Sequence, residues 1–440
     1  MVWARPVQGF YRALRTRVEA VLIGILLIVP WVELGGEPLL RFDIPNRRFH
    51  VAGLVIFPSE FLFLWLLVVG LALALFFFTA LAGRLWCGWG CPQTIFSELF
   101  AAVARRIQGW RGSRPPARVT RARLLATHAV WLALAALIGF HLLGVFVPPR
   151  ELASALARGS ATGTQLGFLA AATGIAYLDF AWVRQTFCKY LCPYARFQSV
   201  LFDRDTLVVA YDPARGEPRG KRGSTTGDCV DCRLCVAVCP TGIDIRQGLQ
   251  LECIACTQCI DACDGVMAKL GREPALIGYR AASGGRARLL RPRVAVYGVA
   301  LCATICVLAV QLAARIPFEV FATHNASSLY STLSDGRTAN SYTLHIENRD
   351  RAAHRFELGL EAPPGFDLLA GVNPIELEPL ASRELRVFVA GPPDGNATAA
   401  REIWFSLADA DRAALRLRRR ATFLSTGASP PAEHTRDDAR

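Results

Sequence analysis

The chain reads CVDCRLCVAVCP at residues 229–240 and CIACTQCIDAC at residues 253–263, and these two stretches hold eight of its 14 cysteines. In each stretch three cysteines are separated by two residues, and a fourth follows after three more. This spacing is typical of two-cluster bacterial ferredoxins, in which the fourth cysteine of each run ligates the other cluster. We therefore predict two 4Fe–4S clusters, the first held by Cys229, Cys232, Cys235 and Cys263 and the second by Cys253, Cys256, Cys259 and Cys239.

The alternative for these cysteines is a pair of structural zinc sites, because thiolates two residues apart also suit tetrahedral zinc. Eight cysteines in the ferredoxin register disfavour zinc. Two iron–sulfur clusters transfer electrons singly, so the sequence predicts an electron-transfer protein. Such clusters need a reducing compartment.

The rest of the chain is unusually apolar for a protein of 440 residues. Hydrophobic residues make up 52% of it, and its mean hydropathy is +0.30. The chain contains several long apolar runs, and long apolar runs are typical of transmembrane helices. The first run follows four arginines without a small-x-small cleavage site, so we read it as an uncleaved span. We predict five spans, at residues 18–34, 60–83, 124–147, 164–187 and 294–314.

The net charge of +13 is unevenly distributed along the chain. Arginine and lysine concentrate in residues 84–123 and 188–293, whereas residues 317–440 are mildly acidic. This asymmetry fits the positive-inside rule better than nucleic-acid binding. We expect both basic segments to be cytoplasmic, which places residues 316–440 outside a bacterial inner membrane.

Composition and periodicity divide the chain into five parts. Residues 1–212 carry the first four spans, residues 213–293 a linker and the ferredoxin domain, residues 294–315 the fifth span, residues 316–425 an exported domain, and residues 426–440 a disordered tail. The exported part alternates apolar and polar residues, with apolar positions at Tyr342, Leu344, Ile346, Phe356, Leu358, Leu360, Leu385, Val387, Val389, Ile403, Phe405 and Leu407. Alternation interrupted by turn residues predicts an immunoglobulin-like β-sandwich. The fold class is thus a five-helix membrane bundle with an inserted α+β ferredoxin domain and a C-terminal sandwich.

Two further cysteine pairs follow the second and fourth predicted spans. They read CGWGCP at residues 87–92 and CKYLCP at residues 188–193. Cysteines four apart lie on one face of a helix, and the proline should break or kink the helix after each pair. If the pairs meet at the cytoplasmic membrane face, Cys87, Cys91, Cys188 and Cys192 offer four thiolates, which suit Cu(I), zinc or an iron–sulfur cluster, or a redox-active dithiol. The alternative is that they are ordinary buried cysteines.

A third pair, Cys302 and Cys306, has the same spacing inside the fifth predicted span but lacks the proline. We favour plain packing for it over a relay of copper or electrons. Asp179 and Arg184 lie in the fourth predicted span. Charges at such depth usually face the bundle interior, although Arg184 has the length to reach the cytoplasmic interface.

Beyond these cysteines, several longer stretches resemble one known family, the CcoG/FixG/RdxA proteins, which are membrane iron–sulfur accessory proteins of cbb(3)-type cytochrome c oxidase. The stretches are TALAGRLWCGWGCPQT (79–94), CKYLCPYARFQS (188–199), FDRDT (202–206), CPTGIDIR (239–246), CIDACD (259–264), LSDG (333–336) and NSY (340–342). The resemblance covers nearly the whole chain. It implies five spans, a cytoplasmic two-cluster domain and an exported, periplasmic immunoglobulin-like domain.

The resemblance also implies a role in copper handling during oxidase assembly. Family members are thought to reduce Cu(II) to Cu(I), which a P-type copper ATPase and copper chaperones pass to the oxidase. On that basis Cys87, Cys91, Cys188 and Cys192 match the family's copper-reduction motif, and the expected partners are a cytoplasmic electron donor, the copper ATPase or chaperone, and oxidase assembly factors. We therefore expect a cupric reductase; the alternatives are a quinol-linked membrane ferredoxin oxidoreductase and a non-enzymatic assembly scaffold.

Overall fold

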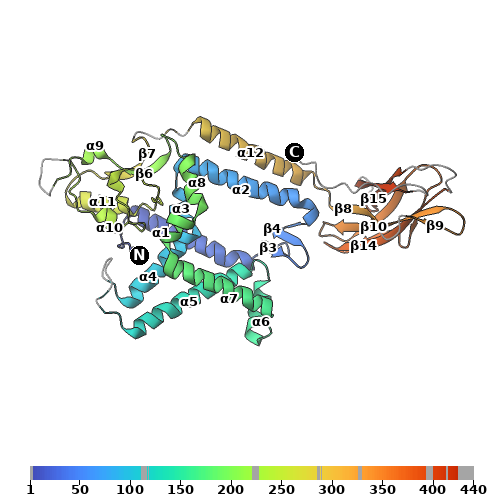
Figure 1. Ribbon diagram of the computed structural model, residues 1–440, viewed down its shortest axis with the longest axis horizontal. Helices are drawn as coiled ribbons and strands as arrows, with labels where there is room; N and C mark the ends of the chain where they lie inside the picture. The colour runs from blue at the N-terminus through green and yellow to red at the C-terminus, as the bar shows by residue number, and fades with distance from the viewer. Residues whose placement is uncertain are drawn as a thin grey trace. The chain divides into compact units, whose positions relative to one another are not determined.

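The structure is a computed structural model that describes residues 3–110, 116, 118–220, 227–284, 288, 290–325, 330–392, 400–412 and 415–424. The chain divides into two compact units, Met1–Val310 and Gln311–Arg440 (Figure 1). The predicted disordered tail, residues 426–440, lies outside the described residues, as does part of the predicted linker.

Four helices among the described residues are long and apolar enough to cross a membrane. They span Pro58–Ala82 (η2, Pro58–Glu60, and α2, Phe61–Ala82), Arg121–Leu143 (α5), Gly163–Val183 (α7, Gly163–Leu178, and η3, Asp179–Val183) and Pro292–Ala313 (α12). Stretches of more than 20 apolar residues match the thickness of a bilayer. These four helices correspond to four of the five predicted spans and mark the chain as a membrane protein.

The first predicted span, residues 18–34, coincides only in part with a helix. Helix α1 runs from Phe10 to Ile28, and its first half carries the charged residues Arg12, Arg15, Arg17 and Glu19. Because of these charges α1 is not among the helices that are apolar enough to cross a membrane, so the count of five spans stays a prediction. A 3₁₀ turn (η1, Val29–Trp31) and five short strands follow it: β1 (Glu33–Leu34), β2 (Glu37–Pro38), β3 (Leu40–Asp43), β4 (Arg48–Val51) and β5 (Leu54–Ile56).

Two predicted spans end earlier than expected. Helix α5 ends at Leu143, four residues before the predicted boundary, because Gly144 and a turn follow it. The regular part of α7 ends at Leu178, and the chain continues as two wider π-helical turns, η3 (Asp179–Val183) and η4 (Phe187–Leu191). Wide turns of this kind are frequent at functional sites. Here they carry the chain into the second cysteine motif.

The membrane helices pack in pairs that aromatic rings help to fix. Figure 1 shows α5 beside α7, and α2 beside α12. The rings of Phe76 on α2 and Tyr297 on α12 lie 6.2 Å apart. Phe100, on the amphipathic helix α4, stacks on Trp131 of α5 with ring centroids 6.0 Å apart. The other short helices of this region are α3 (Leu85–Trp89), α4 (Pro92–Gln108), α6 (Pro149–Arg158) and α8 (Pro193–Leu201).

The cysteine-rich segment of the first unit forms a small α+β domain. Its elements are β6 (Leu207–Tyr211), α9 (Pro213–Gly216), α10 (Leu234–Ala237), η5 (Ile245–Gln247), α11 (Gln258–Lys269) and β7 (Ile277–Ala281). Strands β6 and β7 pair antiparallel and bring together the two ends of the segment. Val209, Met267, Leu276 and Ile277 are almost fully buried beside the cysteines. Of the eight cysteines, Cys229, Cys235 and Cys256 are buried, whereas Cys232 is exposed.

The second unit is a β-sandwich. The strands of the first sheet lie in the order β12 (Asp367–Ala370), β14 (Ser382–Gly391), β10 (Thr338–Asn348) and β8 (Phe318–His324), and β9 (Ser331–Thr332) also pairs with β10. The strands of the second sheet lie in the order β13 (Ile375–Leu377), β11 (His354–Glu361), β15 (Arg401–Asp409) and β16 (Arg416–Phe423). The predicted strands are confirmed. The alternating residues Tyr342, Leu344 and Ile346 are fully buried, and Val387 and Phe405 are buried with them. Period-2 burial is what a sheet with one covered face requires.

Candidate electron-transfer site

The two CxxxCP motifs adopt the same local structure. Cys87 lies in α3, and Cys91 is the extended residue that precedes α4, whose first residue is Pro92. In the second motif Cys188 lies in η4, and Cys192 precedes α8, which begins at Pro193. The expectation that each pair shares one helical face is therefore wrong. Each proline begins a helix instead of breaking one, because the first helical position needs no backbone N–H and favours proline's fixed φ.

The structure brings the four motif cysteines together. The thiol of Cys188 interacts electrostatically with those of Cys87, Cys91 and Cys192, although about 100 residues separate the two motifs. Burial, with a smaller contribution from the neighbouring Cys91, raises the pKa of Cys87 to about 12. The same two causes raise the pKa of Cys188 to about 12. A thiol with so high a pKa stays protonated at neutral pH unless a bound metal ion displaces the proton.

Hydrogen bonds from polar side chains hold the two motifs in place. The Cys87 thiol donates to Gln198 Oε1 at 3.5 Å, and Thr94 Oγ1 donates to the Cys87 carbonyl at 2.6 Å. The buried Arg84 donates from Nη2 to the carbonyl of Ala195 at 2.6 Å. Since Gln198 and Ala195 belong to α8, which follows the second motif, these bonds join it to the first. The arrangement is thus fixed by tertiary contacts.

The first motif also lies against one of the ferredoxin runs. Gly88, the residue after Cys87, has no side chain, and a Cβ placed there would lie 2.5 Å from the carbonyl oxygen of Ile254 and 2.6 Å from that of Ala255. Ile254 and Ala255 stand between Cys253 and Cys256. Only glycine permits this approach of one backbone to another. The CxxxCP motif and the Cys253–Cys256 loop are therefore in direct contact.

The eight ferredoxin cysteines surround two small cavities. Cys229, Cys232, Cys235 and Cys263 line one of about 30 Å³. Cys239, Cys253, Cys256 and Cys259 line the other, of about 20 Å³, which Cys235 also borders. The fourth cysteine of each run thus lies with the other run's first three, as the spacing predicts.

The donor set fits two iron–sulfur clusters. Each cavity offers four thiols among apolar side chains, and burial raises the pKa of Cys256 to about 12 and that of Cys253 to about 11. Coordination to iron removes such protons outright. Within the described ranges no three His, Cys, Asp or Glu side chains, those of the two CxxxCP motifs included, group closely enough to hold a single metal ion.

A buried charge network attaches α1 to the second ferredoxin run. Arg15, fully buried, donates from Nη2 to Glu98 Oε1 at 2.6 Å and from Nη1 to the Cys256 carbonyl at 3.5 Å. Glu98 also accepts from Gln258 Nε2 at 3.0 Å and pairs with Arg12. Burial alone would raise the pKa of Glu98, but Arg15 and Arg12 outweigh burial and hold it below its ordinary value.

Sequence reasoning missed this network. Arg12, Arg15 and Glu19 recur at the three- and four-residue spacing of one helical face, which was the available signal. Nothing in the local sequence connects that face to Glu98 on α4. Gly88 was missed for the same reason, because its role depends on a backbone that lies more than 160 residues away.

The remaining sequence predictions have mixed outcomes. Cys302 and Cys306 are both exposed on α12, so the prediction that they pack inside is wrong. Asp179 accepts a hydrogen bond from Gln93 Nε2 at 3.0 Å. Arg184 is buried, with its guanidinium 3.8 Å from the centroid of the Trp3 ring. These two charges face the protein interior, as expected.

Three family models match the chain. The model for a 4Fe-4S dicluster domain matches residues 183–282, and that for a 4Fe-4S binding domain matches residues 61–111. The model for the IG-like fold at the C-terminus of FixG matches residues 308–426. The first two matches include the CxxxCP motifs as well as the ferredoxin runs.

Two similar proteins match over most of their own length and most of this chain. RdxA of Cereibacter sphaeroides is 36% identical over 83% of this chain and 83% of its own length, and the nitrogen fixation protein FixG of Rhizobium meliloti is 33% identical over 89% and 86%. The ferredoxin-type protein NapH of Haemophilus influenzae is 25% identical over 45% of this chain and 66% of its own length. The chain therefore belongs to the FixG/RdxA family and is a membrane iron–sulfur electron-transfer protein.

Proposed function

We propose that this protein reduces Cu(II) to Cu(I) at the four CxxxCP cysteines during assembly of a cbb(3)-type cytochrome c oxidase. The observation that carries the proposal is the contact of Gly88 with the backbone between Cys253 and Cys256. This contact supports the proposal because Gly88 follows Cys87 directly, and Ile254 and Ala255 stand between the predicted cluster ligands Cys253 and Cys256. An electron carrier next to a soft-metal site is the arrangement that a copper reductase needs.

Each residue group has a defined role in this mechanism. When bound, the iron–sulfur clusters supply one electron at a time. Cys87, Cys91, Cys188 and Cys192 bind copper, and soft thiolates favour Cu(I) over Cu(II), which assists reduction. Copper binding displaces the protons of Cys87 and Cys188 because their pKa values are high. Each turnover converts one Cu(II) to one Cu(I) and consumes one electron, which a cytoplasmic one-electron donor replaces.

The proposal includes a topology and a set of partners. The chain crosses the inner membrane five times, with α1 as the first span, the ferredoxin domain in the cytoplasm and the β-sandwich in the periplasm. The distribution of basic residues supports this orientation. A P-type copper ATPase or a copper chaperone receives the Cu(I), and assembly factors of the oxidase contact the periplasmic domain.

The test is a stopped-flow mix of the anaerobically reduced full-length protein with stoichiometric Cu(II), in which cluster absorbance and Cu(I) formation are recorded together. Cluster oxidation should match Cu(I) formation in time. The double variant Cys87→Ala/Cys188→Ala should keep its clusters but lose this reaction, whereas the control Cys302→Ala/Cys306→Ala should keep both.

Two results would contradict the proposal. Reduction of Cu(II) at the normal rate by the Cys87→Ala/Cys188→Ala variant would show that the motif is not the copper site. Clusters that stay reduced with Cu(II) but oxidise with a quinone would identify a quinol-linked oxidoreductase instead.

A further inference from the structure

A second polar site lies where the N-terminal segment, α1, α4 and the turn after η3 meet. The cavity there has a volume of about 60 Å³, which holds about four water-sized groups. Arg5, Arg12, Arg105 and Arg184 line it, with Glu98 as the one carboxylate among its lining residues. The lining is therefore strongly positive.

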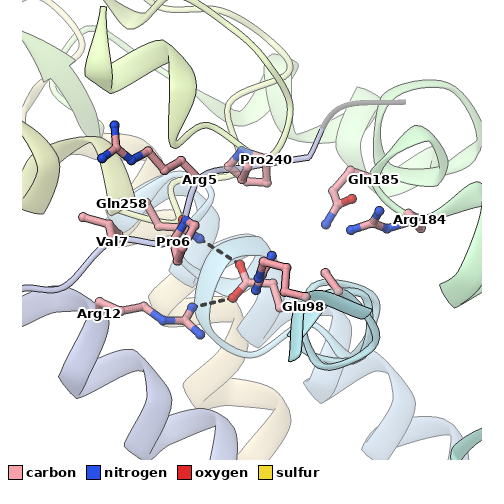
Figure 2. A pocket seen from close by; sticks show the side chains of 12 residues that line it. Arg5, Pro6, Val7, Arg12, Glu98, Arg184, Gln185, Pro240 and Gln258 are labelled. Carbon is pink, nitrogen blue, oxygen red and sulfur yellow. Dashed lines mark hydrogen bonds and ion pairs between the residues drawn. The ribbon is translucent and has the colours of Figure 1, made fainter. Parts of the chain in front are cut away.

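The single carboxylate does not neutralise this charge. Glu98 already accepts hydrogen bonds from Arg12, Arg15 and Gln258. Figure 2 shows Arg12 and Gln258 reaching Glu98 from one side of the cavity, whereas Arg184 and Gln185 point toward it from the opposite side. Glu98 and the Trp3 ring therefore compensate the charge of Arg184 only in part, because no hydrogen bond joins Arg184 to Glu98 in the described part of the chain.

Arg184 and Arg105 are held in an unfavourable state. Arg184 is 5% exposed, and its Nε and Nη1 atoms have no hydrogen-bond partner in the described part of the chain. The guanidiniums of Arg105 and Arg184 are close enough to repel each other. Burial lowers the pKa of Arg105; Glu98 opposes this effect, and Arg12 adds to it. Unsatisfied buried donors and like charges both cost free energy, and a bound anion would remove both costs.

We propose that this cavity binds a phosphate group through Arg105 and Arg184. Guanidinium groups donate two parallel hydrogen bonds to phosphate oxygens, which favours phosphate over a single-point anion. The cavity accommodates the five heavy atoms of one phosphate. The group comes either from free inorganic phosphate or from a phospholipid headgroup, since the cavity lies just after the membrane-spanning helix Gly163–Val183. This site is separate from the copper cysteines, and binding there does not depend on copper reduction.

The test measures phosphate binding to the full-length protein, with matched variants. Isothermal titration calorimetry in detergent with inorganic phosphate should show saturable binding, which Arg184→Gln and, separately, Arg105→Gln should weaken about tenfold or more. Arg106→Gln is the control, because Arg106 is the exposed neighbour of Arg105 on α4 and does not line the cavity. Cluster absorbance confirms that each variant is folded.

A second arm distinguishes the two sources of phosphate. Native mass spectrometry of protein released from phosphatidylglycerol nanodiscs should show a retained phospholipid if the headgroup is the ligand, and Arg184→Gln should lose it while Arg106→Gln keeps it. Binding in either arm supports the site. The proposal is overturned if neither arm shows binding, or if Arg106→Gln weakens binding as much as Arg105→Gln.

Discussion

The contact between the first CxxxCP motif and the Cys253–Cys256 loop predicts a specific effect of Gly88→Ala. The added methyl carbon would lie 2.5 Å from the carbonyl oxygen of Ile254 and 2.8 Å from the carbonyl carbon of Ala255. Ordinary van der Waals contact needs about 3.5 Å, so the two backbones must separate by about 1 Å. Since both neighbours are backbone atoms, no side chain can rotate away to make room.

This separation has two consequences. Overpacking of this size costs about 1–3 kcal/mol of stability. Misplacement of reacting groups by about 1 Å lowers a rate by up to about a hundredfold, so we expect Cu(II) reduction to slow by about tenfold or more while both clusters remain bound. Gly88 is helical and has no positive φ, so alanine introduces no backbone strain of its own there.

The assay is the anaerobic stopped-flow reaction with Cu(II), with iron content and cluster absorbance measured per chain. Gly265→Ala is the matched control, because Gly265 lies on α11 of the same domain and a Cβ there meets no atom within 4 Å. The control should react at the normal rate. Normal reduction kinetics in Gly88→Ala with intact clusters would refute the reasoning that electrons leave through this contact.

Four further predictions concern the charges, thiols and core. Glu98→Gln should lower the stability of the protein by about 3–5 kcal/mol, because it leaves buried arginines without their partner. Thermal loss of cluster absorbance measures the unfolding temperature. A fall in that temperature no larger than the one caused by Glu402→Gln, at an exposed ion pair, would contradict the prediction. The pKa of Glu98 is lower in the folded protein than in the unfolded chain. Glu98 therefore contributes its full stabilisation above its ordinary pKa, and this stabilisation is lost as the pH falls through the folded-state pKa. Thermal scans in acid should show this loss. Alkylation of Cys87 by iodoacetamide at pH 8 should be on the order of a thousandfold slower than for an ordinary cysteine and should rise with pH toward about 12; a mass-spectrometric rate that levels off near pH 9 would exclude the raised pKa. Phe405→Ala should destabilise the β-sandwich by about 3–5 kcal/mol in calorimetry without loss of the clusters, since Phe405 is fully buried in the second unit.

The sequence by itself determined the features that depend on local spacing. Cysteines separated by two residues can surround one cluster wherever the chain runs, so the ferredoxin runs were recognisable, and the four apolar runs had to form helices because a bilayer leaves backbone polar groups no other partners. Alternation in Tyr342, Leu344 and Ile346 likewise predicted a strand with one buried face, which the structure confirms.

Only the tertiary structure decided the features that join distant segments. Proline after each CxxxC was expected to interrupt a helix, but it begins one, so the cysteines of a pair do not share a helical face. The Arg15–Glu98 pair joins residues 83 apart, and the Gly88 contact joins helix α3 to the Cys253–Cys256 loop. Spacing along the chain does not predict such contacts, because each one forms between two elements that are far apart in sequence. Their surfaces meet only when the complete elements pack together.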